Sequence, residues 1–93
     1  MSIPEYINGD TPRFVWINSG VSMSPTIEIR TGSETVVETG TMVDSLNGHY
    51  YYQWQTDPNS YSAGYYVGRM KGSAGGKTFV RDAKIRLIGG GVD

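Results

Sequence analysis

Hydrophobic and polar residues alternate along much of this chain with a period of two. Within residues 26–30, Ile27 and Ile29 fall on one side while Glu28 and Arg30 fall on the other. Successive side chains of a β-strand point to opposite faces, so this alternation indicates a strand with one face in a core. No window of 11 or more residues carries a helical apolar repeat that glycine or proline leaves unbroken. The pattern therefore predicts an all-β protein.

Turn signals divide the chain into about seven short strands. Asn47-Gly48 is a strong turn dipeptide, residues 57–60 form a second turn cluster, and residues 72–76 predict a hairpin loop. The strands are predicted at residues 13–18, 26–30, 34–38, 41–44 (the weakest), 49–55, 64–71 and 77–88. Short strands with turns every ~8–12 residues are typical of an antiparallel sandwich or a small barrel.

The two ends of the chain differ in composition from its middle. Residues 1–12 carry two prolines and a glycine and predict an extended N-terminal arm, and residues 89–93 predict a flexible glycine-rich tail. Residues 13–88 then form the β-sandwich domain. We expect no signal peptide and no transmembrane segment, since the N-terminus lacks a basic start and no apolar run approaches the ~20 residues of a membrane span.

Composition excludes several chemistries. The 93 residues include no cysteine and a single histidine, and the net charge is −1. Disulfide scaffolds, zinc knuckles and thiol nucleophiles are therefore absent. A charge near zero gives no general attraction to nucleic acid or to anionic membranes.

The candidate catalytic and metal-binding features favour plain structural interpretations. His49 begins a strand after a turn, and no serine sits in a Gly-x-Ser-x-Gly elbow. The turn at residues 57–60 lacks the acidic density of a calcium loop, and a strand rather than a helix follows the glycines of residues 72–76. We predict no catalytic residues, no metal and no cofactor, so the chain is not expected to be an enzyme.

Charge and tyrosines suggest a surface for association. Residues 1–64 hold two basic and seven acidic side chains, a net of −5, whereas residues 65–93 hold six basic and two acidic ones, a net of +4. Tyrosine and arginine are favoured at protein interfaces. The candidate interface residues are Tyr51, Tyr61, Tyr66, Arg69, Lys71, Lys84 and Arg86.

One segment resembles strand F of immunoglobulin-like domains, whose common form is Asp-x-Ala-x-Tyr-Tyr-Cys. The match is Ser62-Ala63-Gly64-Tyr65-Tyr66-Val67, with Tyr61 in place of the acid. The resemblance implies an immunoglobulin-like antiparallel β-sandwich. It also implies that Tyr65 is the tyrosine-corner residue, with its ring in the core, and that Val67 takes the place of the disulfide cysteine.

The chain as a whole is similar in style to small immunoglobulin-like modules of tailed-phage virions, through stretches such as residues 47–52 and 64–67. This resemblance implies a non-enzymatic structural protein of a phage-like particle, such as a capsid decoration or tail protein, made in the host cytoplasm. Its partners would be other virion proteins or copies of itself, with nucleic acid and membrane disfavoured. The alternative is a free binding module that recognises carbohydrate or a protein through exposed aromatics.

Overall fold

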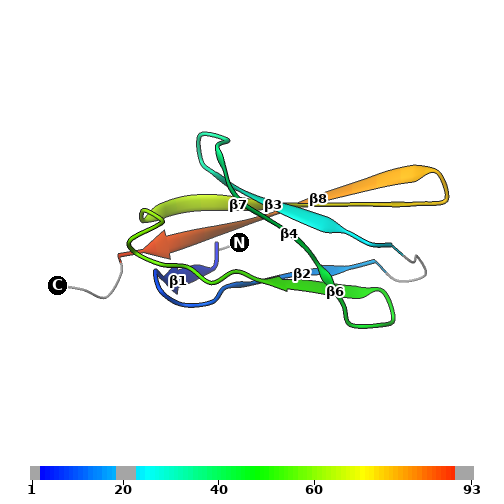
Figure 1. The fold of residues 1–93 in the computed structure, drawn as a ribbon, viewed down its shortest axis with the longest axis horizontal. Helices are drawn as coiled ribbons and strands as arrows, with labels where there is room; N and C mark the ends of the chain where they lie inside the picture. Colours follow the sequence, from blue (N-terminus) through cyan, green and yellow to red (C-terminus); the bar gives the residue numbers. More distant parts are fainter. Residues whose placement is uncertain (1–2, 19–22, 90–93) are drawn as a thin grey trace.

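The computed structural model describes residues 3–18 and 23–89, and within these it is an all-β sandwich of eight strands in two sheets (Figure 1). The strands are β1 (Glu5–Ile7), β2 (Arg13–Ile17), β3 (Thr26–Thr31), β4 (Val36–Thr41), β5 (Val43–Asp44), β6 (His49–Gln53), β7 (Gly64–Ala74) and β8 (Lys77–Ile88). The predicted all-β sandwich is confirmed.

The two sheets differ in size and pairing. One has five strands in the order β1-β8-β7-β3-β4, and the other has three in the order β2-β6-β5. All pairs are antiparallel except β1 with β8, which run parallel. Strands β7 and β8 form the longest hairpin and extend along one side of the molecule (Figure 1).

The predicted N-terminal arm is partly a β-strand. Part of the arm forms β1, where the Arg86 amide donates to the Pro4 carbonyl at 3.0 Å and the Asn8 amide donates to the Ile88 carbonyl at 3.1 Å. The sequence prediction did not include this strand. Residues 90–93 of the expected tail lie outside the described residues.

The hairpin loop is shorter than predicted. Gly72, Ser73 and Ala74 belong to β7, and the turn consists of Gly75 and Gly76, with φ of 58° and 75°. Two consecutive positive φ values define the tight turn whose twist matches that of paired strands. The full eleven residues of β7 can therefore pair with β8.

Aromatic rings fill the space between the sheets. Trp54 is 1% exposed and meets the rings of Tyr61 and Tyr66 edge-on at centroid distances of 4.8 and 5.2 Å. Gly68 lies directly beneath the Phe14 ring, so close that a Cβ at this position would come within 2.6 Å of the ring. Glycine on the inner face of β7 thus lets the opposite sheet approach closely.

Candidate functional site

The four basic candidates lie on the outer face of the five-stranded sheet, and two of them are already paired. Arg69 forms a two-pronged ion pair with Asp82, with Nε–Oδ1 and Nη2–Oδ2 distances of 2.9 and 3.1 Å. Arg86 pairs with Glu5 at 3.1 Å. Lys71 and Lys84 make no ion pair within the described part of the chain. The charges of Arg69 and Arg86 are therefore largely met inside the molecule.

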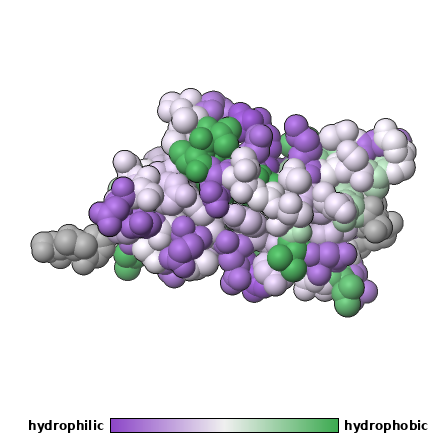
Figure 2. Space-filling view, viewed as in Figure 1, coloured by the Kyte–Doolittle hydropathy of each residue, from purple (hydrophilic) through white to green (hydrophobic). Residues whose placement is uncertain are grey.

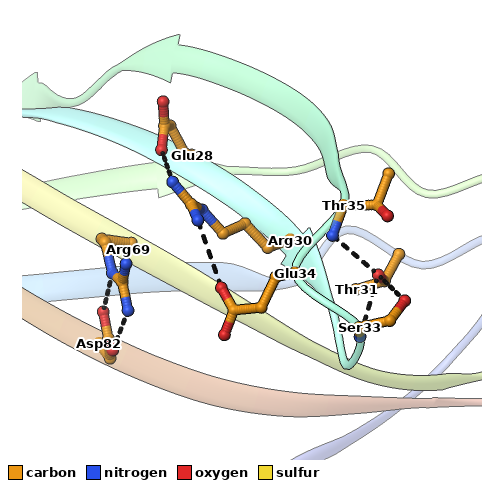
Figure 3. Close-up of polar contacts among 8 residues, drawn as sticks. All are labelled: Glu28, Arg30, Thr31, Ser33, Glu34, Thr35, Arg69 and Asp82. Carbon is orange, nitrogen blue, oxygen red and sulfur yellow. Dashed lines mark hydrogen bonds and ion pairs between the residues drawn. The ribbon is translucent and has the colours of Figure 1, made fainter.

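A second ion-pair cluster lies beside the first on the same face (Figure 3). The Arg30 guanidinium donates to Glu28 at 2.6 Å and to Glu34 at 3.2 Å. The bond from Arg30 lowers the pKa of Glu28, and the bond from Arg69 lowers the pKa of Asp82. This face alternates charge from strand to strand, so water meets a nearly neutral, hydrogen-bonded surface.

The tyrosine assignment needs a one-residue correction in β7. Tyr66, a candidate interface residue, is 4% exposed, and its hydroxyl donates to the Ser62 carbonyl at 2.7 Å. Burial raises the pKa of that hydroxyl. Tyr65, expected in the core, is 48% exposed, and Val67 likewise points outward beside it. The buried tyrosine that resembles the tyrosine corner is therefore Tyr66, and its prediction as an interface residue was wrong.

The sequence held a signal for the correct register. Tyr65 and Val67 lie four and two residues before Arg69, at the same parity as Arg69 and Lys71. The two charges therefore place all four side chains on the outer face. The resemblance to strand F outweighed this alternation in the prediction. The opposite residues, Tyr66, Gly68, Met70 and Gly72, line the core.

The remaining aromatic candidates do not form a common platform. Tyr51 lies on the outer face of the three-stranded sheet, whereas Tyr61 packs edge-on against buried Trp54. Exposed Tyr65 is on the opposite side of the sandwich. Stacking on a sugar or a nucleobase needs aromatic faces that a ligand can reach together. Carbohydrate binding stays a prediction that this arrangement does not favour.

Residues 3–18 and 23–89 contain no group of three or more His, Cys, Asp or Glu side chains that could hold a metal ion. Met23, Met42 and Met70 are buried in the core, between 0% and 6% exposed. The His49 side chain makes no hydrogen bond or ion pair with the described residues. The same part of the chain contains no helix that is long and apolar enough to cross a membrane.

The outer face of the three-stranded sheet carries apolar side chains that the candidate set missed. Val15 on β2 pairs with Tyr51 on β6, and Tyr51 pairs with Val43 on β5, so the three form one row across the sheet. Val15 and Val43 are 49% and 47% exposed, and neighbouring Ile17 is 53% exposed. The Arg13 guanidinium stacks over the Tyr51 ring at 4.1 Å.

We call the row of Val15, Tyr51 and Val43, together with neighbouring Ile17, the apolar row. A shallow hollow of about 180 Å³ opens beside it, lined by Arg13, Val15, Ser45, His49, Tyr50 and Tyr51. Apolar side chains also reach the surface in the view of Figure 2, among them a group near the lower edge where β6 lies. Contiguous exposed apolar residues of this kind are typical of interaction surfaces.

Strand β2 is an edge of its sheet, and its backbone bonds show which groups face outward. The Trp54 amide donates to the Pro12 carbonyl at 2.9 Å, and the Asn18 amide donates to the Gly48 carbonyl at 2.8 Å. Because hydrogen-bonded pairs alternate in an antiparallel ladder, the even residues of β2 bond to β6. The amides and carbonyls of Arg13, Val15 and Ile17 therefore point away from the sheet.

No protein-family model matches the chain, and no curated protein matches it in sequence. Among solved structures, the crystal structure of CopC from Methylosinus trichosporium OB3b is similar, with a TM-score of 0.65 and 11% identity. The match covers 96% of this chain and 86% of that one. At this identity the likeness shows the fold.

The comparison also corrects the expected function. The structure that matches is CopC rather than a virion protein, so the expectation of a phage structural protein, with its capsid or tail location, was wrong. The resemblance that suggested it depended on tyrosine-rich and glycine-rich strands. Such strands serve any small sandwich whose core is aromatic, so they do not identify a virion.

Proposed function

We propose that this chain is a non-catalytic protein-binding β-sandwich that binds an extended strand of a protein at the edge of β2. The observation that carries the proposal is the coincidence of two features on the same three residues. Arg13, Val15 and Ile17 present at the edge backbone groups that pair with none of the described residues, and their side chains lie on the exposed face. A strand added there would gain main-chain hydrogen bonds and apolar contacts together.

The sandwich has other free edges among the described residues, and the long free edge of β8 carries charges that discourage such pairing. Strand β1 covers only residues 86–88 of β8, and the preceding part of β8 has no neighbour on that side among the described residues. Its exposed side chains include Asp82 and Lys84, and charges on an edge strand discourage pairing. The β2 edge instead carries two aliphatic side chains and a single arginine.

The proposal includes no metal chemistry and no catalysis. The described residues provide no metal-ligand group, and the described methionine thioethers are in the core. The likeness to CopC supports the β-sandwich as a scaffold. The non-enzymatic part is supported by His49, which is exposed on the sheet face and makes no side-chain hydrogen bond or ion pair with the described residues.

The test is a titration with a strand-forming probe, followed by amide chemical shifts. The probe is a capped eight-residue peptide in which threonine and valine alternate. We expect shifts centred on the amides of Arg13, Val15 and Ile17. Val15→Pro removes an outward amide that bonds to none of the described residues, so it should keep the fold and lose the shifts.

Val15→Thr is the matched control because it keeps the amide and the β-branched shape. It should retain the shifts with weaker binding, since only apolar contact is lost. Shifts centred on another edge, or unchanged binding by Val15→Pro, would overturn the proposed function.

A further inference from the structure

We infer that the strand received at this edge is β2 of a second copy of the chain, in an antiparallel pair whose two-fold axis passes beside Val15. The inference rests on the proposed function of β2 as a receiving edge and names its partner. The two three-stranded sheets would join into one continuous six-stranded sheet across the axis.

The backbone of β2 is complementary to itself. With Val15 opposite Val15 of the second copy, Arg13 lies opposite Ile17 of that copy, and Ile17 lies opposite its Arg13. All three residues point their amide and carbonyl outward, so each pair can exchange two hydrogen bonds. The pairing would satisfy every outward amide and carbonyl of these residues in both copies.

The side chains favour the same register. In one copy the row Val43–Tyr51–Val15 ends at the free edge. The two-fold axis places the two Val15 side chains beside one another, so the rows of both copies become continuous. The exposed aliphatic surface of Val15, at 49%, would then be covered by an identical surface.

Charge permits this arrangement. Arg13 is the only ionised side chain of β2. In the pair, the two Arg13 residues lie four positions apart along the strands, roughly 14 Å at about 3.4 Å per residue. That separation exceeds the Debye length of about 8 Å at physiological ionic strength, so their repulsion is screened. Each Arg13 faces an isoleucine rather than a like charge.

The size of the contact sets its expected strength. Stable protein interfaces bury about 800 Å² per partner, and a five-residue edge strand with three outward side chains offers less. We therefore expect a weak, concentration-dependent dimer. A partner whose contact is a single strand fits this surface better than one that needs a broad globular footprint.

The natural absence of cysteine allows a register-specific cross-linking test in the full chain. The two Val15 Cα atoms would lie about 5.5 Å apart, inside the range of about 4.4–6.8 Å that a disulfide requires. The two Ile17 Cα atoms would lie at least about 14 Å apart. Under mild oxidation, Val15→Cys should form a covalent dimer at least about tenfold faster than Ile17→Cys.

A mixture of two cysteine variants provides the second arm of the cross-linking test. Arg13→Cys and Ile17→Cys chains should cross-link to each other faster than either variant does alone, because these positions face one another in the pair. Equal cross-linking of Val15→Cys and Ile17→Cys, or no preference in either arm, would overturn the inference. If the peptide probe still binds at β2 in that case, the proposed function stands and only the partner is wrong.

Discussion

The outer faces of the two sheets are both exposed, yet they are constructed in opposite ways. The five-stranded face carries Arg69 and Arg30 beside carboxylates, so most of its arginine charge is met within the chain, while Lys71 and Lys84 make no ion pair with the described residues. The three-stranded face carries aliphatic side chains and a stacked Arg13 with no ion pair among the described residues. A charged ladder completes a surface for water, whereas an apolar row leaves area that a partner can cover.

The packing between the two sheets decides which residues face outward, and Gly68→Val should disturb that packing most strongly. The new side chain would meet the Phe14 ring, whose nearest atom is 2.6 Å from a Cβ at this site. We expect a loss of about 1–3 kcal/mol in the free energy of unfolding. Each kcal/mol lowers Tm by about 4–8 °C in a domain of this size.

Gly89→Ala is the control, because a Cβ there meets nothing within 4 Å. It should leave Tm nearly unchanged. Equal thermal stability of the two variants would show that the sheets are not packed as closely as described.

The next effect tests the register of β7. Tyr66→Phe removes the hydroxyl that donates to the Ser62 carbonyl at 2.7 Å. We expect it to cost about 0.5–1.5 kcal/mol of unfolding free energy in chemical denaturation. Tyr65→Phe should cost almost nothing, since that side chain is 48% exposed. The reverse ranking would restore Tyr65 as the corner residue and would mean that the odd-numbered residues of β7 face the core.

The smallest effect concerns the charged face. Asp82→Asn should lower stability at neutral pH by less than about 1 kcal/mol, because solvent reaches the partly exposed pair with Arg69 and screens it. The pair holds the pKa of Asp82 below its ordinary 3.8. Its stabilisation is therefore present above about pH 5 and is lost as the pH falls through the lowered pKa.

Urea unfolding across pH 2–7 measures this dependence. The wild-type chain and Asp82→Asn should converge in stability at the acid end. A difference that stays undiminished, or grows, as the pH falls from 5 to 2 would contradict an ion-pair origin.

Local patterns predicted much of the fold. The alternation at Ile27 and Ile29 gave β3, and Asn47-Gly48 gave the turn before β6. Strand β1 was missed because three residues carry little pattern, and their pairing depends on β8, which lies far along the chain. The register of β7 was recoverable from Arg69 and Lys71, but a motif resemblance displaced it.

The candidate site was harder to predict than the fold. In β2, Val15 and Ile17 alternate with Phe14 and Trp16, as the two faces of any half-buried strand do. Which of these two faces is covered by the core, and whether β2 has one neighbouring strand or two, depends on strand order. That order follows from pairings between distant segments, which no local pattern reports. The −5 and +4 segments were equally misleading, since Glu5 pairs with Arg86.

Amide hydrogen exchange in β2, measured at low and at high protein concentration, tests the central claim most directly. At low concentration the amides of Arg13, Val15 and Ile17 should exchange quickly, while those of Phe14 and Trp16 are protected by β6. At high concentration the first three should gain protection, and the amides of Val80 and Lys84 on the guarded edge should not. Protection of Val15 that is already complete at low concentration, or that never changes, would contradict an open edge that a second copy covers.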